Sequence, residues 1–121
     1  MADKSQSFRE VIVWQKAHAF TLALYRLTEA FPKHELFALT SQLRRAAASV
    51  PSNFVEGFRK RTIPDKLRFY NIAQAFADEC LYQLILGHDL GYVDTTKLQA
   101  DLEEVSRLLQ GYINGIPPAS P

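Results

Sequence analysis

The chain has 121 residues, 47% of them hydrophobic and 22% charged, with a net charge of +1. This length fits one compact domain, and the composition is that of an ordinary globular protein, which disfavours disorder and fibrous repeats. No uncharged run approaches the ~20 apolar residues that a bilayer span requires, and no apolar signal core follows Lys4, so we expect a cytoplasmic protein without membrane contact.

Four stretches of apolar residues recur in steps of three and four, the spacing that gathers side chains on one face of an α-helix. The first stretch runs from Val13 to Phe31, where Pro32 prevents continuation. The second runs from Leu36 to Phe58 and ends at a basic run. These patterns predict the first two helices of an all-α protein.

Pro51 lies inside the second predicted helix. Proline donates no hydrogen bond to the carbonyl of Ala47 and crowds it, which costs ~3 kcal/mol unless the helix bends. We therefore predict a kink from Ala47 to Pro51, with the Ala47 carbonyl bonded to water or a polar side chain.

Nearby polar residues are predicted to form a structural network that satisfies freed backbone groups. They are Ser49, Ser52, Asn53 and Glu56. A ligand site built on Asn53 and Glu56 is the alternative interpretation.

The third predicted helix begins at Thr62, which can cap its first amides, with Asp65 placed three residues later as in a capping box. It ends at Gly91. Its apolar residues occupy most of the circumference, so the helix is expected to be buried on more than one side, inside the bundle or against another subunit.

The fourth predicted helix follows a cap at Asp94 and carries an apolar stripe from Leu98 to Ile116. No strand pattern competes with these four helices. Four helices joined by short connections pack most simply as an antiparallel up-down-up-down four-helix bundle. We predict a single domain over residues 8–116, with flexible termini at residues 1–7 and 117–121.

Half of the fourteen basic residues fall between positions 44 and 68, where only Glu56 and Asp65 are acidic. These basic residues are Arg44, Arg45, Arg59, Lys60, Arg61, Lys66 and Arg68. Clustered cations contact phosphate groups, so the seven residues form a candidate nucleic-acid-binding patch. Solvated cations that interact with helix ends are the alternative interpretation.

Catalytic chemistry has little support in the sequence. A di-metal bundle needs Glu-x-x-His pairs, but Gln15, Phe31 and Ile85 stand three positions before the three histidines. No arginine precedes a histidine by four to six residues, the spacing of one helical ribonuclease class. The only cysteine, Cys80, has apolar neighbours and Glu79 beside it, which favours a buried core thiol. We expect no enzymatic activity, no metal site and no cofactor.

Several motifs occur together in one order. They are Phe8 to Ala17 (FREVIVWQKA), Phe31-Pro32, Leu39 to Ala47 (LTSQLRRAA), Ser49 to Gly57 (SVPSNFVEG) and Leu90-Gly91-Tyr92. Over roughly residues 8–116 the chain resembles the small bacterial four-helix-bundle proteins first noticed in intervening sequences of large-subunit ribosomal RNA genes. Those proteins are similar to the accessory proteins of diversity-generating retroelements, which form homopentameric rings with a basic nucleic-acid-binding surface. The resemblance therefore implies a homo-oligomer, most simply a pentamer, that binds RNA or DNA.

The leading hypothesis is a non-enzymatic oligomeric bundle that acts as a nucleic-acid-binding accessory protein through its basic patch. The alternative is a structural or protein-interaction scaffold without nucleic-acid binding, in which the basic region meets an acidic face of a neighbouring subunit. Salt-dependent binding to nucleic acid distinguishes the two hypotheses.

Overall fold

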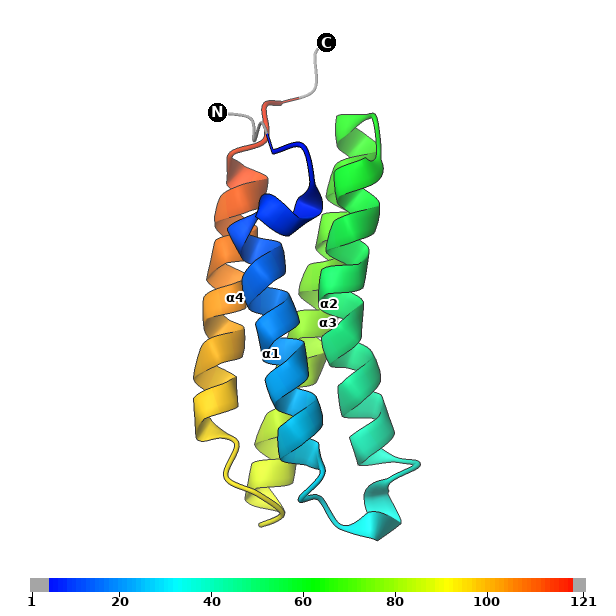
Figure 1. Ribbon diagram of the computed structural model, residues 1–121, viewed down its shortest axis with the longest axis vertical. Coiled ribbons are helices and arrows are strands. Elements are labelled where there is room, and N and C mark those ends of the chain that lie inside the picture. The colour runs from blue at the N-terminus through cyan, green and yellow to red at the C-terminus, as the bar shows by residue number, and fades with distance from the viewer. Residues whose placement is uncertain (1–4, 119–121) are drawn as a thin grey trace.

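The computed structural model describes residues 5–118. In that range it contains four α-helices and two short 3₁₀-helices, and no strand. They are η1 (Phe8–Glu10), α1 (Ile12–Thr28), η2 (Lys33–Glu35), α2 (Leu39–Arg59), α3 (Ile63–Asp89) and α4 (Thr96–Asn114). Successive α-helices lie side by side and run in opposite directions (Figure 1). The predicted all-α, antiparallel up-down-up-down four-helix bundle is confirmed.

The bundle has two distinct ends. The turn between α2 and α3, the start of η1 and the end of α4 lie at one end, and the other two interhelical connections lie at the opposite end (Figure 1). Of the segments predicted to be flexible, residues 1–4 and 119–121 lie outside the described residues. In the described part, Ser7 caps η1, because its hydroxyl oxygen accepts a bond of 3.2 Å from the amide of Arg9. None of the described helices is both long and apolar enough to cross a membrane.

Small residues are frequent among the buried positions of α2 and α3. The small buried residues of these two helices include Ala46, Ala47, Gly57, Ala73, Ala77 and Cys80. A Cβ atom on Gly57 would lie 2.5 Å from Cε1 of Tyr70, closer than van der Waals contact allows. Tyr70 in turn stacks on Phe54, with 5.1 Å between ring centroids, and meets Tyr112 of α4 edge to face. The absence of a side chain at Gly57 thus permits this aromatic cluster.

Helix α1 ends at Thr28 and not at Phe31, so the first predicted helix is three residues too long. Phe31 is still buried, because the chain turns after Thr28 and brings the ring against Gly87 and Tyr92. The periodicity therefore identified a core residue correctly but placed it in the wrong local structure.

Helix α2 begins at Leu39, three residues later than predicted, because η2 and the non-helical Ala38 precede it. The carboxylate of Glu35 accepts bonds from the hydroxyl of Tyr92, at 2.8 Å, and from the amide of Leu39, at 3.3 Å. These bonds, that from Tyr92 above all, lower the pKa of Glu35. The two bonds also fix the connection between α1 and α2. Phe37 lies in this connection and is 92% exposed.

Helix α2 continues through Pro51 without interruption. The carbonyl of Ala47, which lacks a donor from Pro51, lies 3.2 Å from the hydroxyl of Thr21 on α1. That hydroxyl also lies 2.8 Å from the carbonyl of Ala17, so the two acceptors share one donor. The expected polar partner for Ala47 is thus confirmed, and it comes from a neighbouring helix. The bend itself stays a prediction.

The predicted ends of α3 are confirmed. The hydroxyl of Thr62 accepts a bond of 3.3 Å from the amide of Asp65, as a helix cap does. At the other end Gly91 has a φ of +79°, and the amides of Gly91 and Tyr92 bond the carbonyls of His88 and Gly87. This pair of bonds is the Schellman arrangement, which glycine favours because it has no Cβ.

The start and the end of α4 each differ slightly from the prediction. Thr95 occupies the cap position, while the carboxylate of the predicted cap, Asp94, accepts a bond of 2.9 Å from the amide of Thr96. The helix ends at Asn114, two residues before Ile116. Ile116 still packs on the core, so here too the apolar stripe extends past the helix.

Candidate nucleic-acid interface

The seven predicted basic residues lie in two groups on α2, on α3 and in the turn between them. Arg44 and Arg45 are in the first two turns of α2, whereas Arg59 is its last residue. At 1.5 Å per residue, the two groups are separated by ~20 Å along the helix axis. The basic residues between positions 44 and 68, predicted as one patch, therefore lie at two different heights along the bundle axis.

Six cations gather at the end of the bundle where α2 turns into α3, and we call this surface the basic end. Its residues are Arg9, Arg59, Lys60, Arg61, Lys66 and Arg68. Five of them were predicted from the sequence. Arg9 was missed because it lies fifty residues earlier, in η1, which the fold places beside the end of α2. The guanidinium groups of Arg9 and Arg59 both lie over the ring of Phe8, so Phe8 connects η1 to the end of α2.

Two aromatic rings hold four of these cations. Lys60 and Arg68 lie 5.0 and 4.8 Å from the ring centroid of Phe69. Arg9 and Arg59 lie 5.6 and 6.0 Å from that of Phe8. Cation–π contacts at exposed positions contribute ~0.5–1 kcal/mol each, enough to restrict a flexible side chain. A guanidinium stacked on a ring keeps its N–H edge available for a phosphate.

Carboxylates at the basic end neutralise it only partly. Glu56 lies 4.0 Å from Lys60, and Asp65 lies 4.0 Å from Arg68, with both members of each pair well exposed. Exposed ion pairs of this kind contribute ~0–1 kcal/mol and are screened by salt. A phosphate can therefore replace these carboxylates at little cost.

Lys66 has a structural role within the basic end. Its ammonium donates to the carbonyls of Gly57, at 3.2 Å, and Phe58, at 2.8 Å, which are among the last carbonyls of α2. A cation at this position also interacts favourably with the helix dipole. Burial lowers the pKa of Lys66. Lys66 thus joins the start of α3 to the end of α2.

Arg44 joins α1 to α2 at the opposite end. Its Nε donates to the hydroxyl of Thr28 at 2.9 Å, a terminal nitrogen donates to the carbonyl of Tyr25 at 3.3 Å, and its guanidinium lies over the Tyr25 ring. These contacts use two of the five N–H donors of the guanidinium and direct the side chain toward α1. Arg45, by contrast, is exposed.

We expect the substitution Arg44→Met to lower the free energy of unfolding by about 1–2 kcal/mol, because two charge-assisted hydrogen bonds are removed. Arg44→Lys should recover only part of this stability, since lysine cannot reproduce the forked geometry. Chemical denaturation monitored by circular dichroism measures both values. Equal stability of Arg44→Met and the parent would show that this contact does not hold the helices together.

The predicted polar network on α2 is smaller than expected. The hydroxyl of Ser49 donates to the carbonyl of Arg45 at 2.7 Å, and the side-chain amide of Asn53 donates to the backbone carbonyl of Ser49 at 2.8 Å. Ser52 is exposed, and Glu56 pairs with Lys60 as described. Ser49 and Asn53 thus bond carbonyls of their own helix, while Thr21 provides the partner for Ala47.

The described residues form neither a metal-binding cluster nor an exposed thiol. In the described part of the chain no group of three or more His, Cys, Asp or Glu side chains could hold a metal ion. Cys80 is buried in the core, and burial, together with the charge of Glu79, raises the pKa of its thiol to about 12. Because the thiolate is the nucleophile, this cysteine is inert at neutral pH.

Together these features define a small all-α four-helix-bundle protein with cations gathered at one end. The chain belongs to the 23S rRNA-intervening sequence protein family, whose family model matches residues 9–111. The predicted family resemblance is thus confirmed.

A solved structure has the same fold. It is a crystal structure, at 1.70 Å resolution, of a protein with unknown function from the S23 ribosomal protein family of Bacteroides thetaiotaomicron VPI-5482. The two chains are 23% identical with a TM-score of 0.77, and the match covers 85% of this chain and 96% of that one. No curated protein matches the chain.

Proposed function

We propose that this protein is a non-enzymatic, oligomeric accessory protein of the cytoplasm that binds RNA or DNA through its basic end. The observation that carries the proposal is the gathering of six cations from η1, the end of α2, the turn that follows it and the start of α3, five of them lying over aromatic rings. Pre-positioned guanidinium and ammonium groups suit phosphate contacts, which supply most non-specific nucleic-acid affinity.

The test is binding of fluorescently labelled duplex DNA and single-stranded RNA, measured by anisotropy over a series of salt concentrations. We expect affinity to fall linearly with salt on a double-logarithmic plot, with a slope of about −0.9 per phosphate contacted on duplex DNA. Shuffling the base sequence should change the affinity little, because phosphates carry no sequence information. Absence of binding at low salt would contradict the proposal.

Exposed apolar side chains support self-association. Phe37 is 92% exposed, and on α3 Tyr82 is 63% exposed. Helix α3 thus retains apolar surface that the single bundle does not cover. Surfaces of this kind mark subunit interfaces, and self-complementary copies assemble with closed symmetry. The resemblance to ring-forming bundles favours a pentamer, in which weak basic sites would act together by avidity.

We expect the substitution Phe37→Ser to lower the molar mass of the assembly, measured by light scattering, while changing the free energy of unfolding of the protomer little. The reason is that Phe37 contacts solvent in the single bundle, so its removal affects only contacts with another copy. Lys97→Ser is the control, since its side chain is 87% exposed but charged. A parent protein that is monomeric at micromolar concentration would contradict self-association.

The same exposed residues favour the second candidate function, a protein-interaction scaffold without nucleic-acid binding. In that case the cations of the basic end would meet carboxylates of a neighbouring subunit. The assembly would then dissociate with rising salt, and the protein would bind no nucleic acid at any concentration.

A further inference from the structure

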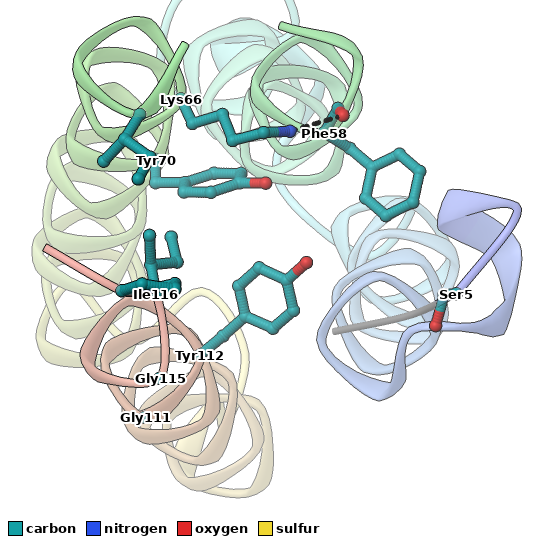
Figure 2. Close-up of a pocket in the computed structure, with 10 residues that line it drawn as sticks. Ser5, Phe58, Lys66, Tyr70, Gly111, Tyr112, Gly115 and Ile116 are labelled. Carbon is teal, nitrogen blue, oxygen red and sulfur yellow. Dashed lines mark hydrogen bonds between the residues drawn. The ribbon is translucent and has the colours of Figure 1, made fainter. Parts of the chain in front are cut away.

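A cavity of about 690 Å³ opens at the same end of the bundle, between the end of α2, the start of α3 and the end of α4. Figure 2 shows Phe58, Lys66, Tyr70 and Tyr112 around it. The volume lies within the range of small-molecule sites, which are mostly apolar with a few polar groups. The rings of Phe8 and Phe69, which carry four of the other five cations of the basic end, do not line this cavity.

Glycine residues on α4 leave room for the cavity. Gly111 and Gly115 both line it and are one helical turn apart. A Cβ atom built on Gly111 would meet no heavy atom within 4 Å. The end of α4 and the residues that follow it therefore contribute Tyr112, Ile116 and Pro117 as the larger side chains of this wall.

Lys66 is the charged group of the wall. An ammonium has three N–H donors, of which at most two serve the carbonyls of Gly57 and Phe58. Within residues 5–118 no carboxylate lies within 4.0 Å of Lys66, so its charge has no ion-pair partner there. Apart from Ser5, the remaining walls are mostly apolar or aromatic and include Phe58, Ile63 and Ile116. One cation beside apolar walls is complementary to a molecule with one anionic group and an apolar body.

We propose that this cavity binds a small organic anion with a planar apolar body, such as an aryl carboxylate or aryl sulfonate. The anionic group accepts a hydrogen bond from Lys66, and the apolar body lies among Phe58, Tyr112 and Ile116. Charge-assisted hydrogen bonds are about twice as strong as neutral ones, and burial strengthens them further. The basic end adds positive potential around the opening, which raises the local concentration of anions.

The test uses the full chain and two dyes that differ by one charged group. The anionic dye is 8-anilino-1-naphthalenesulfonate, and N-phenyl-1-naphthylamine is its neutral counterpart. We expect the sulfonate to bind saturably with one site per chain and about tenfold more tightly than the neutral dye, since only the sulfonate can use Lys66. Equal affinity of the two dyes, or no saturable binding, would overturn the proposal. This comparison requires no variant.

Variants locate the site. We expect Lys66→Met to weaken binding of the sulfonate about tenfold and Lys66→Arg to retain most of it, because arginine keeps a cation at the wall. Lys60→Met is the matched control, since it removes the same charge at the same end but outside the cavity. An equal weakening in Lys60→Met and Lys66→Met would show that the dye responds only to the general positive potential, and would overturn the proposal.

Discussion

Replacing Gly57 with alanine is expected to lower the free energy of unfolding by about 2 kcal/mol, although alanine is the better helix former by ~1 kcal/mol. The added Cβ would lie 2.5 and 2.8 Å from ring carbons of Tyr70 and 3.2 Å from the carbonyl oxygen of Lys66. The Tyr70 ring cannot move aside easily, because it is buried between Phe54 and Tyr112. Thermal and chemical denaturation at one protein concentration measure the change in stability.

The matched control is Gly111→Ala, the same substitution in another helix. A Cβ there meets no atom within 4 Å, so only the helix propensity changes and the protein should become more stable by roughly 0.5–1 kcal/mol. Opposite signs for the two variants would confirm that the close approach of α2 and α3 depends on Gly57. A neutral Gly57→Ala variant would mean that the aromatic cluster can rearrange.

Replacing Arg59, Lys60 and Arg61 together with alanine is expected to weaken nucleic-acid binding roughly 100-fold at 0.1 M salt and to reduce the salt slope by about 0.9 for each phosphate that the variant no longer binds. The three residues end α2 and begin the turn to α3, and none of them belongs to the hydrophobic core. Helical content measured by circular dichroism should therefore remain that of the parent. Anisotropy titrations over a salt series provide the affinities.

The control for this variant removes three positive charges from the opposite end of the bundle, at Arg26, Lys33 and Arg45. These residues are exposed and lie near the connection between α1 and α2. Because long-range attraction is screened over about 8–10 Å at these salt concentrations, the control should bind almost as tightly as the parent. Equal weakening in the two triple variants would place the binding surface along the length of α2 and not at the basic end.

The helices of this protein are determined by local sequence. Apolar spacing, the cap at Thr62 and the left-handed Gly91 each act within one or two turns, so the sequence predicted four helices and their antiparallel order. The errors are confined to the ends, as at Phe31 and Leu36, where an apolar residue continues the periodic pattern beyond the helical backbone. Periodicity reports which residues are buried and not the backbone conformation that buries them.

The candidate site depends on contacts between segments that are distant in sequence, and only the tertiary structure established it. It placed Arg9 beside Arg59, and it separated Arg44 and Arg45 from the other predicted cations by ~20 Å along α2. It also turned Lys66 toward the last carbonyls of α2 and a cavity. The sequence shows which residues are charged. A basic surface forms only when several cationic side chains lie on the same face of the molecule, and the packing of the helices decides which face each of them occupies.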